Sequence, residues 1–322
     1  MKKSVLFYLL ASFTCIVSGQ TEKLLVPSDL KQQTIVTEPV TLRKGFFRSG
    51  LLVNYRVADR FFNGEGEKEY YRTSSWGSTA AYGLTLQYGI TDRFEALLVT
   101  EYRNTLTETQ STGIITGINK SLIISEKHKG IGIGDSHVNM KYQVIPEAEG
   151  KLSLTGGLKV TVPTGEKNPR NISNENRYDL PVGNGTFAMG LSLSGRKINY
   201  PYSYSGFLSY TNNFNGYRIL TVTDEAERKF RFGNLFETGI SINLHLNEWI
   251  VFTNDANFYN EGEGMIENAP AATMPASWAL SYEPGLIFQV FRFRLGESVR
   301  MPVAGKNVPA DPLFVILAQY IF

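Results

Sequence analysis

Hydrophobic and polar residues alternate with a period of two along most of this chain. In residues 135–145, an apolar face alternates with a face of Asp, His, Asn, Lys and Gln. Successive side chains of a β-strand point to opposite faces, so this pattern predicts a strand with one apolar and one polar face. Two further strands, 202–211 and 249–259, are expected without an assignment of their faces. The alternation recurs in residues 47–57, 76–88, 94–103, 152–162, 186–196, 236–246, 277–290, 291–301 and 313–322.

These segments make about twelve strands of roughly 10–13 residues. Strands of soluble proteins usually have about 5–6 residues, whereas a tilted membrane-crossing strand needs about 9–11. Short turns alternate with long polar stretches. An even number of strands then places both termini of the chain on the short-turn side of the membrane. The sequence therefore predicts an all-β fold, a transmembrane antiparallel β-barrel with short periplasmic turns and long extracellular loops. The expected long loops are residues 59–75, 105–131, 164–183, 212–233 and 261–275.

The first residues are typical of an export signal. A basic start precedes the apolar run 5–17, which is too short for a transmembrane helix of about 20 residues. We expect residues 1–19 to be a signal peptide, and a lipoprotein signal that uses Cys15 is the alternative. Residues 20–45 are expected to be a periplasmic N-terminal lead or a plug, and residues 46–322 the outer-membrane β-barrel.

The composition agrees with a membrane barrel once the residues are sorted by face. A mean hydropathy of −0.16 is too low for a protein of many transmembrane helices, but averaging over a period of two cancels the apolar faces. The aromatic content of 12% suits the two membrane interfaces, where a ring is apolar at one end and hydrated at the other. A net charge of +2 gives no general attraction to nucleic acid, so membrane lipid and a small-molecule solute are the expected partners.

Three motifs carry a resemblance to a known family. They are the segments 132–135, leading into Lys141 and Tyr142, 157–165 and 89–95, which read GIGD, GLKVTVPTG and GITDRFE. The chain resembles the outer-membrane proteins named for the meta-cleavage pathway of phenol degradation, through most of its mature length. The resemblance implies a transporter of small solutes, including hydrophobic or aromatic compounds.

The motif residues are expected to act structurally. Glycine permits a bend or a close strand contact where a loop enters the barrel, proline ends a strand, and Thr-Gly suits the turn after it. This structural set is Gly132, Gly134, Asp135, Pro163, Thr164 and Gly165. The last residue, Phe322, with Tyr320 on the same face, resembles the C-terminal signal read by the barrel-assembly machinery.

If the apolar faces meet lipid, the polar faces line the lumen. Charged rings tune the selectivity of a pore, so these residues are candidates for a solute track, and mutual pairing across a narrow barrel is the alternative. The basic candidates are Arg48, Arg56, Arg103, Lys141, Lys159, Arg196, Arg292, Arg294 and Arg300. The acidic candidates are Glu95, Glu101, Asp135, Glu237 and Glu283.

Chemistry-bearing motifs are weak in this sequence. A lipase-like hydrolase needs a histidine beside its serine, and no serine stands two residues from His137 or His245 on the same strand face. No cofactor fingerprint and no metal-ligand spacing are present, so we expect no catalytic residues, no cofactor and no metal. The leading hypothesis is a channel for passive uptake of small solutes. A barrel hydrolase and a structural or adhesive barrel are the alternatives.

Overall fold

The computed structural model describes residues 40–71, 76–115, 120–148, 150–168, 170–172, 177–219 and 226–322. The expected signal peptide, Cys15 and most of the expected N-terminal lead lie outside these residues. Among the described residues, no helix has the length and apolar content needed to cross a membrane.

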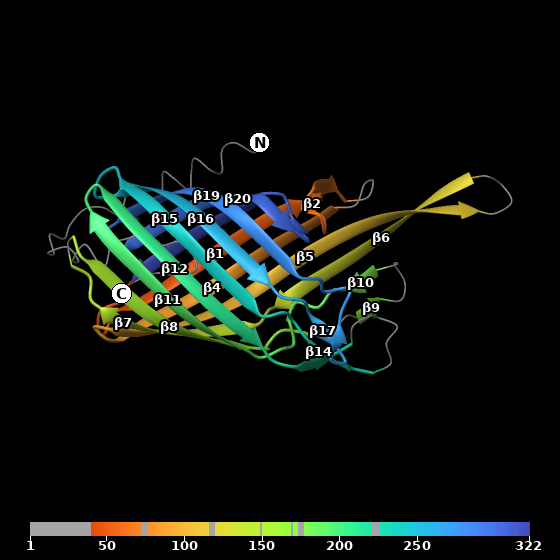
Figure 1. The fold of residues 1–322 in the computed structure, drawn as a ribbon, viewed down its shortest axis with the longest axis horizontal. Coiled ribbons are helices and arrows are strands. Elements are labelled where there is room, and N and C mark those ends of the chain that lie inside the picture. Colours follow the sequence, from red (N-terminus) through yellow and green to blue (C-terminus); the bar gives the residue numbers. More distant parts are fainter. Residues whose placement is uncertain are drawn as a thin grey trace. The chain divides into compact units, whose positions relative to one another are not determined.

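Within this described part, twelve long strands form one closed barrel (Figure 1). Each strand is antiparallel to both of its neighbours, and β1 closes the ring by pairing with β22 on one side and β4 on the other. The expected fold class is therefore confirmed. The strands are β1 (Phe47–Ala58), β4 (Trp76–Thr91), β5 (Phe94–Ile115), β7 (Ser136–Ile145), β8 (Leu152–Val162), β11 (Ala188–Asn199), β12 (Tyr202–Asn213), β15 (Leu235–His245), β16 (Ile250–Glu261), β19 (Ser277–Val290), β20 (Phe293–Lys306) and β22 (Leu313–Ile321).

Short connections gather at one end of the barrel, which we call the turn end. Residues 92–93, 146–151, 200–201, 246–249 and 291–292 join successive strands there. The two ends of the barrel sequence meet at the same place, because the backbone N–H of Phe322 donates to the carbonyl of Phe47 at 2.8 Å. The expected alternation of short and long connections is confirmed. The first barrel strand begins and the last one ends at the turn end, as expected.

One long connection differs from the expectation. Residues 105–131 were expected to be a polar loop, but β5 continues to Ile115 and pairs with β6 (Lys120–Ile133) in a long hairpin. Figure 1 shows this hairpin extending beyond the neighbouring strands. The threonine and isoleucine content of the segment favours strand over loop, so its polarity alone was misleading.

Short strands also order the other long connections. Residues 59–75 contain β2 (Arg60–Phe62) and β3 (Lys68–Tyr70). β2 is the middle strand of a small antiparallel sheet and pairs with β3 on one side and with β21 (Val308–Pro309) on the other. A second small sheet joins two of the loops, the one between β12 and β15 and the one between β16 and β19. Its strands are β13 (Gly216–Arg218), β14 (Arg228–Arg231), β17 (Met265–Ile266) and β18 (Ala269–Pro270), while β9 (Arg170–Ile172) and β10 (Arg177–Asp179) extend the main sheet beside β6.

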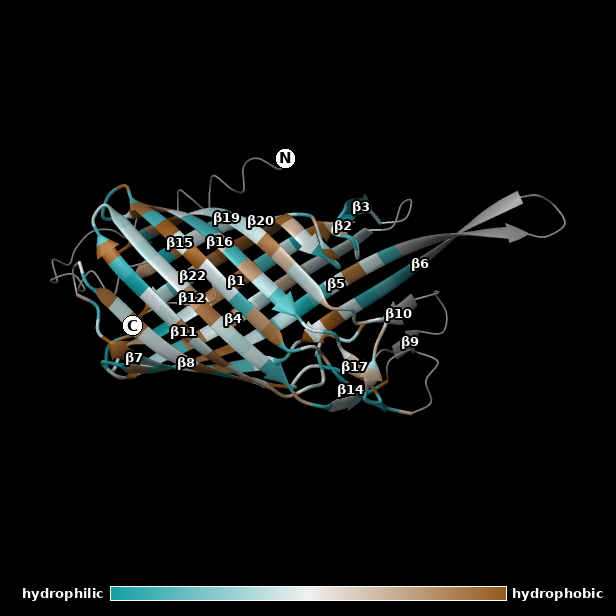
Figure 2. Cartoon of the chain, viewed as in Figure 1, coloured by the Kyte–Doolittle hydropathy of each residue, from teal (hydrophilic) through white to brown (hydrophobic). Residues whose placement is uncertain are grey.

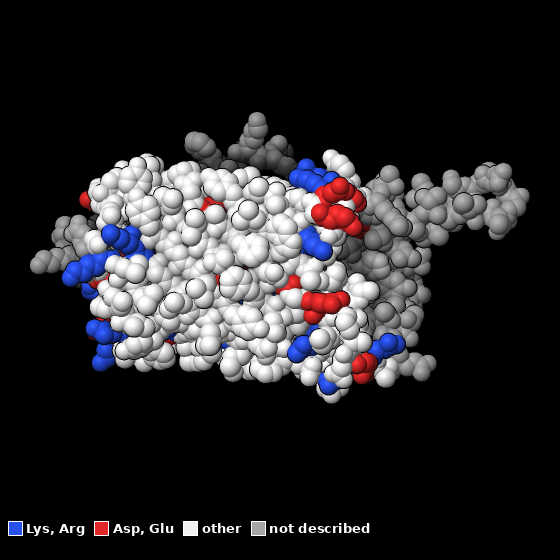
Figure 3. Space-filling model, viewed as in Figure 1, with Lys and Arg blue, Asp and Glu red and all other residues white. Residues whose placement is uncertain are grey.

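The barrel is apolar outside and polar inside, as the alternation predicts. Figure 2 shows hydrophobic and hydrophilic residues alternating along the strands. Outward residues such as Leu191 and Ile240 are 67% and 64% exposed, whereas the inward Ser203 and Asn243 are fully buried. On the face seen in Figure 3, most charged side chains gather toward the two ends of the barrel, with a largely uncharged band between them. This distribution fits a wall that meets hydrocarbon over its middle.

The structure assigns the faces of the two ambiguous strands. In β12, Tyr202, Tyr204, Leu208 and Tyr210 point outward, and Phe207 is an inward residue that interrupts the simple pattern. In β16, the outward Asn254 accepts a hydrogen bond from the hydroxyl of Tyr282 at 2.7 Å. Phe207 is apolar but faces inward, and Asn254 is polar but faces outward with a hydrogen-bond partner. These two exceptions explain why alternation alone could not assign the faces of β12 and β16.

The last strand carries apolar residues on both faces for a structural reason. Its inward Val315 and Leu317 are buried and pack with Leu52 of β1 and with Leu313. Leu52 and Leu317 are direct cross-strand partners. A small apolar cluster therefore lies on the inner wall at the seam where the barrel closes.

The two faces of β12 should tolerate charge differently. We predict that Leu208→Lys lowers the free energy of unfolding by about 2–4 kcal/mol, because a lysine there meets hydrocarbon. Ser205→Lys, whose side chain faces the lumen, should cost much less. Urea unfolding in lipid vesicles measures both values, and equal losses would contradict the assigned faces.

Candidate functional site: the barrel lumen

Arginine and glutamine side chains form a belt inside the barrel near the turn end. The belt residues lie on five adjacent strands and are 3–7% exposed: Gln87 on β4, Arg48 on β1, Gln319 on β22, Arg294 on β20 and Gln289 on β19. Arg48 Nη1 donates to Gln87 Oε1 at 3.4 Å. Long polar side chains of five neighbouring strands therefore line the lumen at the turn end.

The segment that precedes β1 folds against the inner wall at this end. The backbone N–H of Leu42 donates to Glu95 Oε2 at 2.7 Å, and Lys141 Nζ lies 3.3 Å from Glu95 Oε1. Val40 and Leu42 are buried, and Glu95 is fully buried. The segment 40–44 is therefore held against the inner wall by a carboxylate that also binds a lysine.

The motif at residues 89–95 explains how this contact forms. A Cβ atom at Gly89 would lie 1.9 Å from the carbonyl oxygen of Arg43, so only glycine lets the two backbones approach. Asp92 Oδ1 accepts a hydrogen bond from the backbone N–H of Lys44 at 3.2 Å. Gly89, Asp92 and Glu95 thus fasten the N-terminal segment, which gives the motif a physical meaning.

The other two motifs meet in a second fastening point. Asp135, which is 3% exposed, accepts hydrogen bonds from the backbone N–H groups of Gly165 at 3.2 Å and Asn184 at 2.7 Å. A Cβ atom at either Gly165 or Gly183 would lie 2.7 Å from the Cα atom of the other. Thr164 Oγ1 donates to the carbonyl of Gly134 at 3.0 Å. The loop after Pro163 is thereby tied to the wall where β6 becomes β7.

Several expected lumen charges have ion-pair partners, some within the expected set and one in a turn. Arg103 Nη2 lies 2.9 Å from Glu101 Oε2, and Arg196 Nη2 lies 2.7 Å from Glu147 Oε1. Lys159 sits on β8 opposite Asn139 of β7. Of the two alternatives raised by the sequence, mutual pairing therefore accounts for part of the set.

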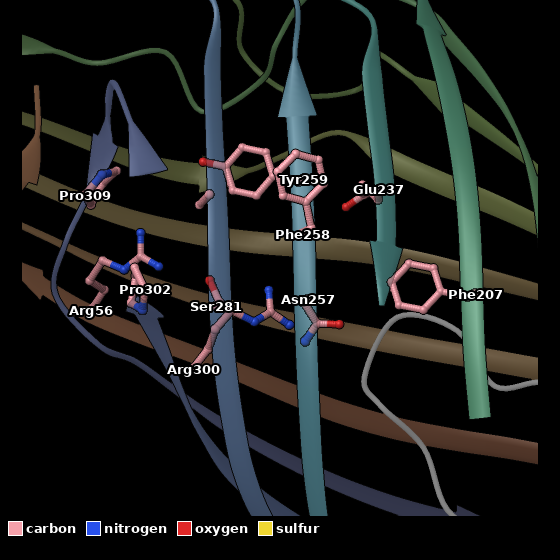
Figure 4. A pocket seen from close by; sticks show the side chains of 11 residues that line it. Arg56, Phe207, Glu237, Asn257, Phe258, Tyr259, Ser281, Arg300, Pro302 and Pro309 are labelled. Atoms are coloured by element: carbon pink, nitrogen blue, oxygen red, sulfur yellow. The ribbon is translucent and has the colours of Figure 1, made fainter. Parts of the chain in front are cut away.

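A cavity of about 130 Å³ opens in the lumen (Figure 4). It lies farther from the turn end than the apolar cluster of Leu52, Val315 and Leu317. Arg56 of β1 and Arg300 of β20 line it at the same level, because both are cross-strand partners of Leu313. Arg300 Nε donates to Glu283 Oε2 at 2.7 Å, and the hydroxyl of Ser298 donates to Glu283 Oε1 at 2.6 Å.

The rest of the cavity wall mixes aromatic and polar side chains. Phe207, Glu237, Asn257 and Tyr259 line it from β12, β15 and β16. Figure 4 shows Tyr259 and Asn257 between Arg56 on one side and Glu237 and Phe207 on the other. The cavity is thus the place where expected lumen charges remain beside open space.

Loops at the end of the barrel opposite the turn end pack against the cavity wall. Phe62 and Val308 are buried against Ala279 and Ala310, with Tyr259 packed on the cluster. Asp311 accepts hydrogen bonds from the backbone N–H groups of Asp59 at 2.9 Å and Arg60 at 2.8 Å, and also pairs with the Arg60 guanidinium. We call this contact the Asp311 clasp.

The clasp shifts the pKa of its carboxyl group. Burial alone would raise the pKa of Asp311, but the Arg60 backbone N–H, its guanidinium and the Asp59 backbone N–H favour the carboxylate. These hydrogen bonds together hold the pKa of Asp311 below its ordinary value. The clasp is therefore charged at neutral pH.

Arg292 differs from its expected position. It was expected on the inward face of a strand beginning at residue 291, but β20 begins at Phe293 and Arg292 lies exposed in the two-residue turn. Phe291 adopts a positive φ of 52° there, which a turn requires and a strand does not. Arg294 and Arg300 of the same expected ladder do face inward, but Arg294 belongs to the belt and Arg300 to the cavity.

Sequence reasoning missed two sets of residues. Phe207, Asn257 and Tyr259 of the cavity fall on the two strands whose faces were left open, so no signal selected them. A Ser203–His245 pair, with Oγ and Nε2 3.1 Å apart, joins β12 to β15. A search within one strand cannot find such a pair, because the partners are brought together by the register of two strands.

Comparison with known proteins supports the fold. No family model matches the sequence. Among solved structures, the COG4313 outer membrane channel from Pseudomonas putida F1 matches with a TM-score of 0.65 and 12% identity, covering 90% of this chain and 100% of that one. The translocator domain of the autotransporter NalP from Neisseria meningitidis matches with a TM-score of 0.48 and 9% identity, covering 86% of this chain and 88% of that one. The Ralstonia pickettii toluene transporter TbuX matches with a TM-score of 0.43 and 10% identity, covering 87% of this chain and 90% of that one.

The first of these likenesses establishes that this chain has the fold of an outer-membrane channel barrel. That is the kind of protein that its sequence motifs resemble, so the fold implied by the resemblance is confirmed.

Removal of the Asp135 carboxylate should release the loop that it holds. We expect Asp135→Ala to make residues 163–187 sensitive to limited proteolysis and to lower the unfolding free energy by about 2–4 kcal/mol, since two backbone donors lose a charged acceptor. Asp135→Asn should have a smaller effect, and Glu263→Ala in an exposed loop none. Unchanged protease sensitivity of Asp135→Ala would contradict the fastening role.

The Asp311 clasp should weaken in acid. Because the folded-state pKa lies below the unfolded value of about 3.9, its stabilisation is present above that value and is lost as the pH falls through the lowered pKa. Hydrogen-exchange protection at the amides of Asp59 and Arg60, corrected for intrinsic rates, should drop in this range. Asp311→Asn should remove the pH dependence, and an identical profile in both proteins would refute the assignment.

Proposed function

We propose that this chain is an outer-membrane channel for passive passage of small solutes, including the hydrophobic or aromatic compounds that its family resemblance implies. The observation that carries the proposal is the lumen cavity, where charged, aromatic and amide side chains line open space inside a closed wall. A barrel of this strand number is wider than the eight-stranded barrels that side chains nearly fill, and narrower than porins of about 16–18 strands.

The proposal includes control of the turn end by the N-terminal region. Residues 20–45 act as a plug whose last part, 40–44, is anchored to Glu95 and the Gly89 turn. The arginine and glutamine belt supports this idea, because its long side chains are buried at the same end of the lumen and occupy part of that space. Residues 1–19 direct export and are removed.

Two further parts of the proposal concern assembly. The outward ring of aromatic and aliphatic side chains binds membrane lipid, and the C-terminal strand presents Tyr320 and Phe322 to the barrel-assembly machinery. Their rings stack edge to face at a centroid distance of 4.8 Å, and Phe322 also contacts Phe47 of β1 at 5.7 Å. These contacts lie at the seam where β22 pairs with β1 and closes the barrel.

A hydrolase remains the second candidate because of the Ser203–His245 pair. Nucleophilic catalysis needs a serine that a substrate carbonyl can reach. Ser203 is fully buried and His245 is 7% exposed, so the pair is better explained as a cross-strand hydrogen bond of the inner wall. The channel is therefore the function that the geometry supports best.

Planar-bilayer recording tests the channel and its plug together. We expect ion conductance from the folded wild-type protein and a conductance about twofold larger for Leu42→Pro, which removes the N–H that binds Glu95. Leu42→Ala keeps this N–H and should stay near the wild-type value. Folded protein without conductance, and without solute uptake in liposomes, would exclude the channel, whereas equal conductance of all three proteins would exclude only the plug.

A further inference from the structure

The charges around the lumen cavity do not all cancel locally. Arg300 is neutralised by Glu283, whose two oxygens bind Arg300 Nε and the hydroxyl of Ser298. Asp311 is occupied by Arg60 in the clasp. Among the residues that the structure describes, Arg56 and Glu237 remain as the two charged side chains of this wall that have no ion-pair partner.

The hydrogen bonds of Arg56 and Glu237 agree with this lack of ion-pair partners. The Nε atom of Arg56 is buried and has no hydrogen-bond acceptor in the described part of the chain. Glu237 Oε2 accepts a single hydrogen bond from the hydroxyl of Ser209 at 3.3 Å. An unpaired charge in a narrow lumen keeps its hydration or takes a charged group of a solute in its place.

The two charges lie on opposite sides of one small space. Figure 4 shows Arg56 and Glu237 flanking the cavity with the ring of Tyr259 between them. The volume of about 130 Å³ is close to that of a cavity of about 150 Å³ that holds one benzene molecule. A solute of this size would feel a positive group at one end and a negative group at the other.

This arrangement selects by the internal charge separation of the solute. An anion is attracted by Arg56 and repelled by Glu237, and a cation meets the reverse, so net charge of either sign gains little. A molecule that carries both a carboxylate and an ammonium group offers each of the two side chains a group of opposite charge. Tyr259 and Phe207 offer apolar contact for the rest of such a molecule.

We propose that the cavity is a selectivity site for small zwitterions of free amino-acid size, bound with the carboxylate toward Arg56 and the ammonium toward Glu237. The inference rests on the proposed channel function and adds a polar solute class to it. It assigns Glu237 an attractive role that a simple anion-selective pore would not give it.

The test compares two solutes of nearly equal size and no net charge, alanine, which is a zwitterion, and lactamide, which is not. Proteoliposome swelling rates are corrected with protein-free liposomes. We expect the wild-type alanine-to-lactamide ratio to exceed that of the Arg56→Gln/Glu237→Gln double variant by about threefold or more. The charge-exchanged variant Arg56→Glu/Glu237→Arg should recover the preference, because a zwitterion can bind in the reversed orientation.

Single variants give an independent readout in planar bilayers. Arg56→Gln should shift the reversal potential in a KCl gradient toward cation selectivity, and Glu237→Gln should shift it toward anion selectivity. Lys151→Gln in a turn and Glu263→Gln in a loop are exposed charge controls that should change neither measurement. Heat-modifiable migration on gels verifies that each variant is folded.

The outcomes separate this inference from the channel itself. Passage of both solutes with the same ratio in wild-type protein and in the double variant would overturn the zwitterion site and leave the channel intact. Single variants that shift the reversal potential in the same direction would also overturn it. Absence of conductance and of swelling for either solute would instead overturn the channel.

Discussion

The structure depends on one constraint, which is that backbone N–H and C=O groups in hydrocarbon need hydrogen-bond partners within the protein. A strand satisfies half of its groups on each side, so a sheet in a membrane has to close on itself. The pairing of β22 with β1 meets this requirement here. Closure then fixes the remaining features, since one face of every strand must meet lipid and the other must share a lumen with eleven neighbours.

The wall was predictable from sequence because period-two alternation acts over whole strands. It located the strands, the turn end and the lipid faces of all but two strands without knowledge of any contact. It failed where one residue broke the rule for a local reason, as with inward Phe207, outward Asn254 and the turn residue Arg292. It also failed for the β5–β6 hairpin, because polar residues that form a strand outside a membrane follow no lipid-facing pattern.

The lumen was less predictable, since its chemistry depends on register between strands. The sequence identified Arg56, Arg300, Glu237 and Glu283 as inward residues, but not which of them pair. Only the pairing of β19 and β20 places Glu283 beside Arg300 and leaves Arg56 with no such partner. Likewise, Ser203 and His245 are 42 residues apart and meet through one hydrogen bond.

The contact between Gly165 and Gly183 has a consequence for which positions of the barrel can change without loss of the fold. Two backbones in van der Waals contact leave no room for a side chain, so both positions resist mutation together with the Asp135 that bonds this loop. The cavity residues face open space, so their side chains can change without a clash between backbones. A backbone contact of this kind therefore constrains the scaffold of the barrel more tightly than the side chains that line its cavity.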